Sequence, residues 1–228
     1  MTDKRPVFSR IAGAIVLLLL TGTVVWFLTH GLPWAPRQGG WEQKGGQGLA
    51  DFGTVPAFSL TERSGKSVTL RDLGGQVWVA NFMYTSCEDT CPLQSAVLAK
   101  LQSQWGPHAD LKVVSITVDP ERDTPAVLSR YADRFGADPD RWFFLTGPKA
   151  AIYRLAQEGF HLSATPATGT QGGDGLEFVH SSRFVLVDGQ ARIRGYYQSD
   201  DPEALRQLSK DVKWLLTHEE RRGKKIPA

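Results

Sequence analysis

The chain has 228 residues, with 26 Lys and Arg against 24 Asp and Glu, and a formal net charge of +2. The positive excess lies at the two ends, so the body lacks the basic stripe that is typical of a nucleic-acid-binding domain. A hydrophobic content of 41% argues against intrinsic disorder, and the length suits one domain of ordinary size with appendages.

An uncharged apolar run over residues 11–29 comes first in the chain. As a helix rising about 1.5 Å per residue it would span roughly 28 Å, close to the thickness of the hydrocarbon layer of a bilayer. Basic residues in segment 1–10 favour a cytoplasmic N-terminus, which places the rest of the chain outside the cytoplasm. We therefore predict a transmembrane anchor. A cleaved signal peptide is the alternative, but Trp26 and Phe27 stand where small residues would precede a cleavage site.

The composition changes after the anchor. Residues 30–48 are rich in glycine, which favours a flexible linker. We predict a folded domain over residues 49–218 and a charged, solvated tail over 219–228.

Hydrophobic patterns within 49–218 predict alternating strands and helices. Apolar runs predict buried strands at 77–84, 111–118 and 142–145. Helical spacing predicts helices after Pro92, with Leu93 on the apolar face, over 125–135 with Thr124 as its cap, over 148–157, and after Pro202. Asp188-Gly189 between apolar runs 183–187 and 193–197 is typical of a hairpin. The order predicts an α/β domain, a thioredoxin-like sheet with flanking helices.

The two cysteines of the chain, Cys87 and Cys91, lie where the first predicted buried strand gives way to a helix. The N–H groups and dipole of a helix N-terminus stabilise a thiolate and lower its pKa. Such a pair could form a disulfide, exchange it with a partner, or bind a soft metal. A purely structural bridge is the weakest of these alternatives, because so short a loop removes little entropy from the unfolded chain.

Three motifs occur in order: Thr85-x-Cys87-x-Asp89-x-Cys91-Pro92, the run from Thr117 to Pro125, and His180-Ser181 before a strand that ends Leu186-Val187-Asp188. In this order and spacing the chain resembles the Sco/SenC family of membrane-anchored copper chaperones, over residues from about 52 to 215.

The resemblance implies a thioredoxin-like domain in which Cys87, Cys91 and His180 bind copper, as Cu(I), Cu(II) or both. Two thiolates and an imidazole suit Cu(I) independently of any family. Asp89 and Asp119 are candidates for carboxylates close to the metal that affect the thiols.

The chain departs from the family pattern at two positions. It has Glu88 where proline is common, and Val179 where an aspartate often precedes the histidine. Val179 would remove an acidic group that orients the imidazole, which puts the metal affinity more in question than the fold.

The remaining candidate ligands are assigned to other roles. We expect the histidines at 30, 108 and 218 to be solvated residues or helix C-terminal cations rather than ligands. We also expect a partly buried His161 and core positions for Met83, Trp78 and Phe82.

The resemblance implies a copper metallochaperone at the outer face of the bacterial inner membrane. It would deliver copper to the binuclear copper centre of cytochrome c oxidase, in subunit II, or to another copper acceptor. A thiol–disulfide oxidoreductase that uses Cys87 and Cys91 as its redox-active pair to reduce the copper-ligand cysteines of the oxidase remains the alternative, as does a redox sensor. A peroxidase of the same fold fits poorly, since it would favour a single cysteine of low pKa. His180 discriminates between copper binding and thiol exchange, because copper binding should need this residue and thiol exchange does not.

Overall fold

A computed structural model describes residue 21 and residues 49–106, 110–162 and 182–223, with side chains up to residue 218. The predicted N-terminal segment 1–10, the linker 30–48, the segment 163–181 that contains His180, and the anchor 11–29 apart from Thr21 fall outside these ranges. The chain divides into two units, Met1–Lys44 and Gly45–Ala228, and the second is described by itself below. Among the helices within the described ranges, none combines the length and apolar character needed to cross a bilayer.

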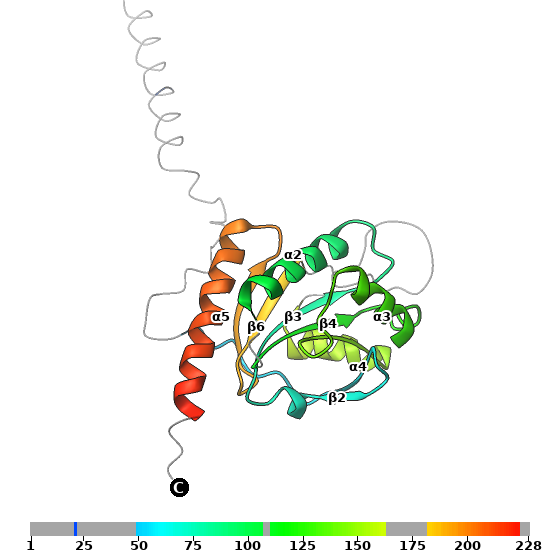
Figure 1. Cartoon of the computed structure of the whole chain (residues 1–228), viewed down its shortest axis with the longest axis horizontal. Coiled ribbons are helices and arrows are strands. Elements are labelled where there is room, and N and C mark those ends of the chain that lie inside the picture. The colour runs from blue at the N-terminus through cyan, green and yellow to red at the C-terminus, as the bar shows by residue number, and fades with distance from the viewer. Residues whose placement is uncertain (1–20, 22–48, 107–109, 163–181, 224–228) are drawn as a thin grey trace, which may run out of the picture. The chain divides into compact units, whose positions relative to one another are not determined.

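A seven-stranded mixed sheet forms the centre of the second unit (Figure 1). Its strands in spatial order are β2 (Ser67–Thr69), β1 (Ser59–Glu62), β5 (Trp142–Thr146), β4 (Leu111–Thr117), β3 (Val77–Met83), β6 (Arg183–Val187) and β7 (Ile193–Gln198). The central strands β3, β4 and β5 run parallel, and the flanking pairs are antiparallel.

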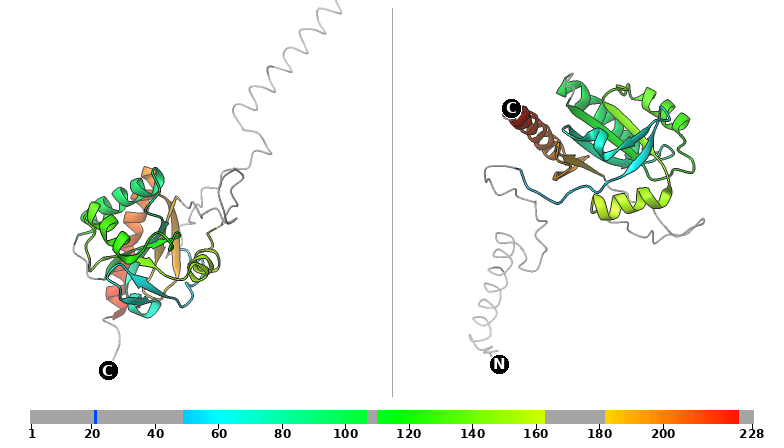
Figure 2. Two further views of the ribbon diagram at one scale, coloured as in Figure 1. Left: turned by 90° about the vertical axis from the view of Figure 1, so that its right-hand side faces the viewer. Right: turned by 90° about the horizontal axis from the view of Figure 1, so that it is seen from below.

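Helices cover both faces of this sheet (Figure 2). They are α2 (Thr90–Trp105), α3 (Pro125–Arg134), α4 (Lys149–Arg154) and α5 (Pro202–Gly223), with a 3-10 turn η1 (Leu70–Leu73) and a π-helical turn η2 (Leu155–Gly159). Apolar residues of α2, α3 and α5 pack with Val77 and Val79 of β3, whereas those of α4 and η2 pack with Trp78 and Ala80. Successive residues of β3 therefore serve opposite cores, because strand side chains alternate between faces.

The predicted buried strands, the helices after Pro92 and from Pro125, and the final hairpin and helix are confirmed. Thr124 caps α3 by accepting the Val127 N–H at 3.4 Å, and Pro125 occupies the first turn. Met83, Trp78 and Phe82 are buried as predicted.

Some expectations were wrong. The Leu93 side chain is 69% exposed rather than in the core, because it faces away from the side on which Cys91, Leu98 and Leu101 are buried. His161, two residues after η2, is exposed with a φ of 50°, and is not partly buried.

Other expectations placed element boundaries differently. The predicted helix 148–157 is a short α4 continued by η2 to Gly159. The sequence did not predict β1 and β2, and α5 continues past His218 to Gly223.

The sheet brings two loops together at one edge. Because β3 and β4 are parallel with Met83 opposite Thr117, their carboxyl ends lie side by side. The segment with both cysteines follows β3, and the segment from Val118 to Thr124 follows β4.

Candidate functional site

The cysteine pair is presented by a tight turn after β3. The Cys87 N–H donates to the Tyr84 carbonyl at 3.3 Å, which closes a four-residue turn. Helix α2 then begins at Thr90, with Pro92 in its first turn, where proline costs no hydrogen bond. The Cys91 N–H donates to the Cys87 sulfur at 3.4 Å, and both residues are free cysteines. The strand–turn–helix order of the sequence thus places both sulfur atoms at the start of α2.

The two thiols are chemically unequal. Burial acts to raise the pKa of Cys87, but hydrogen bonds from the backbone N–H groups of Cys91 and Asp89 outweigh it and leave the Cys87 pKa below its ordinary value. Burial raises the pKa of Cys91 to about 12, and the charges of Cys87 and Asp123 add to this. The lowered pKa predicted at the helix N-terminus therefore holds for Cys87, which is half-buried, and not for Cys91, which is 4% exposed.

Tyr84 is a neighbour of the pair that the sequence did not single out. Burial, together with a hydrogen bond to Cys87, raises the pKa of Tyr84 to about 12. The Tyr84 hydroxyl therefore stays protonated at neutral pH and donates to the Cys87 sulfur, which stabilises the thiolate. Its position directly before Thr85 of the motif is the only sequence signal that could have found it.

The two predicted carboxylates lie in different surroundings. Asp89 is exposed at the start of α2 and makes no side-chain cap bond, and its backbone N–H donates to Cys87. Asp119 is 7% exposed, pairs with Arg122 at 3.4 Å, and donates its N–H to the Thr117 hydroxyl at 3.0 Å.

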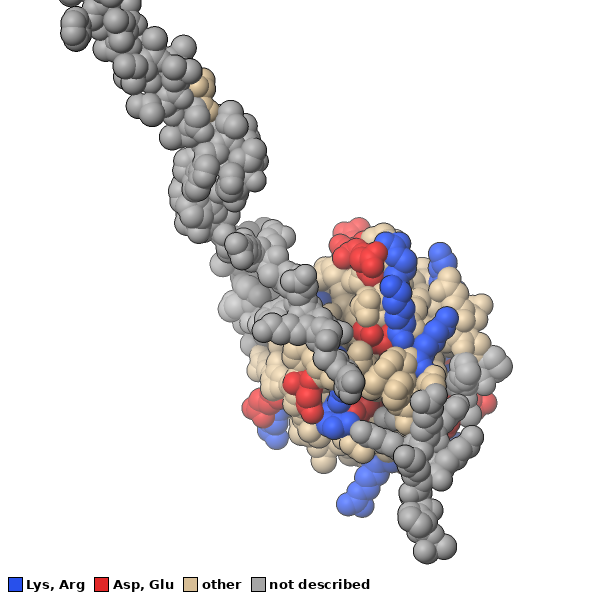
Figure 3. Space-filling view, turned by 90° about the vertical axis from the view of Figure 1, so that its left-hand side faces the viewer, with Lys and Arg blue, Asp and Glu red and all other residues tan. Residues whose placement is uncertain are grey.

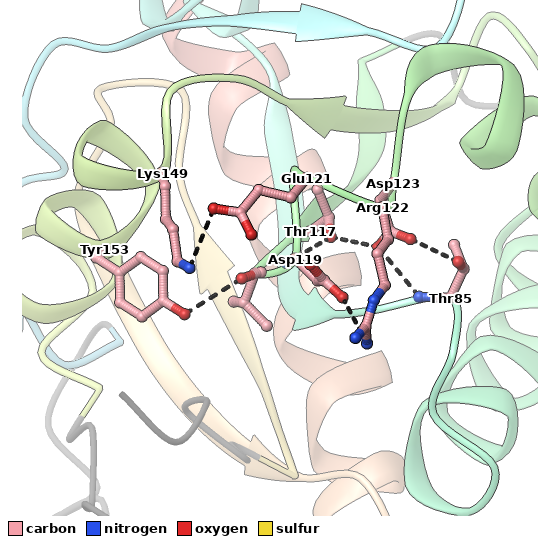
Figure 4. A network of polar contacts seen from close by, with 9 residues as sticks. Thr85, Thr117, Asp119, Glu121, Arg122, Asp123, Lys149 and Tyr153 are labelled. Atoms are coloured by element: carbon pink, nitrogen blue, oxygen red, sulfur yellow. Dashed lines mark hydrogen bonds and ion pairs between the residues drawn. The ribbon is translucent and has the colours of Figure 1, made fainter. Parts of the chain in front are cut away.

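Asp123, a motif residue to which the sequence gave no role of its own, contacts the cysteine turn directly. Its carboxylate is fully buried and accepts the Thr85 N–H at 3.1 Å and the Thr85 hydroxyl at 2.5 Å (Figure 4). The Thr117 hydroxyl donates to the same carboxylate. Asp123, and not Asp119, is thus the carboxylate joined to the segment that carries Cys87.

His180 lies outside the described residues, but the chain that follows it is tied to α2. The Ser182 carbonyl accepts the Ser199 N–H at 2.7 Å, and the Ser199 hydroxyl accepts from the Gln94 amide at 3.2 Å. Gln94 is 2% exposed and stands three residues after Cys91 on α2. Within the ranges that the structure describes, no group of three or more His, Cys, Asp and Glu gathers as a metal site would require.

Charged side chains of both signs are interspersed over the described part of the face in Figure 3.

Comparison with known proteins places the chain in a family. The SCO1/SenC family model matches residues 47–217. The SCO1 protein homolog of Bacillus subtilis is 31% identical over 165 residues, which cover 72% of this chain and 83% of that protein.

Two solved structures are similar throughout the domain. BsSco, described as a member of the Sco family of cytochrome c oxidase assembly proteins with a disulfide switch, has a TM-score of 0.62 at 29% identity, covering 75% of this chain and 97% of that one. Bradyrhizobium japonicum ScoI with copper bound has a TM-score of 0.60 at 27% identity, covering 72% and 99%. These likenesses confirm the predicted thioredoxin-like α/β sheet. Both the family model and the relatives agree with the motif resemblance, and the chain belongs to the SCO1/SenC family.

Proposed function

We propose that this protein binds copper through Cys87, Cys91 and His180 and passes it to a copper-accepting protein in the assembly of cytochrome c oxidase. Membership of the SCO1/SenC family supports this, as does the copper bound in the Bradyrhizobium relative. The donor set fits the ion, because two sulfur atoms at the start of one helix are soft ligands that suit copper. The third ligand would complete the coordination of Cu(I) or help to hold Cu(II).

The observation that carries the proposal is the tie between Ser182 and α2. Ser182 is bonded to Ser199 and Ser199 to Gln94, so the start of β6 is held at the first turns of the helix that contains Cys91. His180 precedes Ser182 by two residues, and two extended residues reach at most about 7 Å. This short reach supports a role for His180 at the sulfur pair.

The proposed topology follows the charge pattern of the N-terminus. Residues 1–10 would lie in the cytoplasm, 11–29 would anchor the chain in the inner membrane, and 30–48 would tether the domain. Domain 49–218 would then face the periplasm, where its acceptor, subunit II of the oxidase or another copper protein, would meet it.

Release of the ion would proceed by ligand exchange at the more accessible sulfur. Cys87 is half-buried while Cys91 is buried, so an incoming thiolate of the acceptor can reach the ion on the side of Cys87. Each new copper–sulfur bond replaces one bond to this protein, and no electron needs to move.

A second candidate, thiol–disulfide exchange, is favoured by the unequal pKa values of the two cysteines. The Cys87 thiolate would attack a disulfide of the oxidase and release one partner thiol, forming a mixed disulfide. Cys91, after losing its proton, would attack the Cys87 sulfur and release the second partner thiol. The two electrons come from the cysteine pair, which ends as a Cys87–Cys91 disulfide.

Titration of the reduced full-length chain with Cu(II) separates the two candidates. The chaperone proposal expects one copper ion per chain with thiolate-to-copper charge-transfer absorption, and loss of that absorption in Cys87→Ser and in Cys91→Ser. A chain that reduces a disulfide peptide, gives no charge-transfer band with Cu(II) and does not take Cu(I) from a competing chelator would instead establish the exchange reaction alone.

A further inference from the structure

A buried carboxylate holds the turn that presents Cys87. Asp123 is 0% exposed, and its two oxygen atoms accept from the Thr85 N–H, the Thr85 hydroxyl and the Thr117 hydroxyl. Figure 4 shows Asp123 placed between these two threonines, one from the loop after β3 and the other from β4. Hydrogen bonds to a charged acceptor are stronger than those between neutral groups, and an unsatisfied buried carboxylate is costly. Opening the turn at Thr85 would therefore leave Asp123 poorly satisfied.

The position of Thr85 makes this contact relevant to the cysteines. The turn that is closed by the Cys87 N–H on the Tyr84 carbonyl has Thr85 as its second residue. Closure of this turn brings the Cys87 sulfur to the Cys91 N–H. Anything that fixes Thr85 thus fixes the sulfur of Cys87 relative to Cys91.

The other end of the contact is itself rigid. Thr117 ends β4 opposite Met83, and its hydroxyl oxygen also accepts the Asp119 N–H at 3.0 Å. The Asp123 N–H in turn donates to the Asp119 carbonyl at 2.9 Å, which closes the loop between β4 and α3. The carboxylate is therefore held by the sheet and can act as a fixed point for the turn.

We propose that Asp123 is a positioning residue for the cysteine pair, whose carboxylate holds Thr85 and thereby keeps the two sulfur atoms facing one another. This role rests on the proposed function, since both a copper site and a thiol-exchange site need two sulfur atoms that are already held close together. The hydrogen bonds that support it all lie within this chain. It gives a role at the cysteine turn to Asp123, whereas the sequence offers Asp89 and Asp119 as candidates for carboxylates close to the metal.

The test measures how closely the two thiols are held, without copper. The full-length chain is equilibrated with glutathione, so that the two cysteine thiols and one oxidised glutathione give one Cys87–Cys91 disulfide and two reduced glutathiones. The equilibrium constant reports the effective concentration of one thiol at the other. Thr85→Val removes one hydroxyl donor while keeping the side-chain volume, and Thr85→Ser restores the hydroxyl.

A matched control separates positioning from general stability. Ser115→Ala removes another buried hydroxyl, one that bonds Asn81 at 2.7 Å and Trp142 at 2.9 Å inside the sheet. We expect Thr85→Val to lower the glutathione equilibrium constant about tenfold and Thr85→Ser to stay within about twofold of the wild type. Ser115→Ala should lower the free energy of unfolding without changing this constant.

An equal shift in Ser115→Ala and Thr85→Val, or no shift in Thr85→Val, would overturn the proposal. If Thr85→Val does not fold, Asp123→Asn decides, because it keeps the shape and one acceptor oxygen but loses the charge. Its constant must then fall relative to Ser115→Ala, and an unchanged constant refutes the role of Asp123. A separate copper titration of the wild type tests the proposed function, so the two can fail independently.

Discussion

The backbone N–H of Cys91 donates a hydrogen bond to the sulfur of Cys87, 3.4 Å away. The first turn of α2 therefore stabilises a negative charge on one cysteine of the pair, while the other is buried and has a pKa raised to about 12. This asymmetry makes Cys87 the sulfur that reacts first with a partner or a reagent.

Alkylation should therefore distinguish the two cysteines. In the reduced full-length chain at pH 7 we expect iodoacetamide to modify Cys87 at least about tenfold faster than Cys91, since one pKa unit changes the thiolate fraction of a protonated thiol tenfold. Because the Cys87 pKa lies below its ordinary value, its rate should rise with pH and level off at a lower pH than for a free cysteine. Mass spectrometry of quenched, digested samples measures both rates.

The variant Cys87→Ser provides the control for this experiment. It should leave Cys91 as the one remaining thiol, still slow to react because it is buried. Equal rates at the two cysteines in the wild type would contradict the assigned asymmetry.

The tie between Gln94 and Ser199 should matter for copper affinity. Gln94→Met keeps the length of the side chain but removes the amide that donates to the Ser199 hydroxyl. This hydrogen bond contributes about 1 kcal/mol to holding the start of β6, and thus the proposed ligand His180, close to α2. Its loss should therefore weaken copper binding about fivefold. Competition with a chelator of known affinity measures the change.

Gln102→Met is the matched control on the same helix. Near the C-terminal end of α2, the Gln102 side chain donates to the Gly136 carbonyl and accepts the Asp138 N–H. Equal copper affinities for Gln94→Met and Gln102→Met would show that the tie to Ser182 does not support the metal site.

Two tyrosines of β7 offer a test of the fold itself. The buried Tyr197 donates to the Asp211 carboxylate at 2.7 Å, and the half-buried Tyr196 donates to the Phe160 carbonyl at 3.1 Å. Tyr197→Phe should lower the free energy of unfolding by about 1.5–3 kcal/mol, and Tyr196→Phe by about 0.5–1.5 kcal/mol, because only the first loses a charged acceptor. Urea unfolding gives both values, and the reverse order would contradict the packing of α5 on β7.

Hydrophobic pattern and turn chemistry predicted the parts of the fold that are buried on both faces. Val77–Met83 and Leu111–Thr117 are apolar runs without competing signals, and Thr124-Pro125 is a strong helix start. Strands β1 and β2 were missed because Ser59–Glu62 and Ser67–Thr69 are short and partly polar, and β2 lies at the edge of the sheet. β1 also pairs with β5, which lies far away in the sequence.

The sequence could predict which residues form the candidate site, but not their burial, hydrogen bonds or pKa values. The spacing of Cys87 and Cys91 identified the pair, yet their unequal pKa values depend on burial that is created by tertiary packing. The contact of Asp123 with Thr85 joins residues 38 positions apart, and no local pattern distinguishes it from Asp119. Leu93 matches the helical spacing of apolar residues in the sequence, but the packing of α2 on the sheet decides which side of the helix is exposed.

Copper binding by His180→Ala tests the central claim most directly. The matched control is His161→Ala, which removes an exposed histidine next to Leu162 in the domain. The reduced full-length wild type and His161→Ala should bind one copper ion per chain with the same affinity and charge-transfer band. His180→Ala should bind at least about a hundredfold more weakly, since a ligand and its ordering are lost. Copper binding by His180→Ala as tight as that of the wild type would contradict the proposed ligand set and favour thiol exchange.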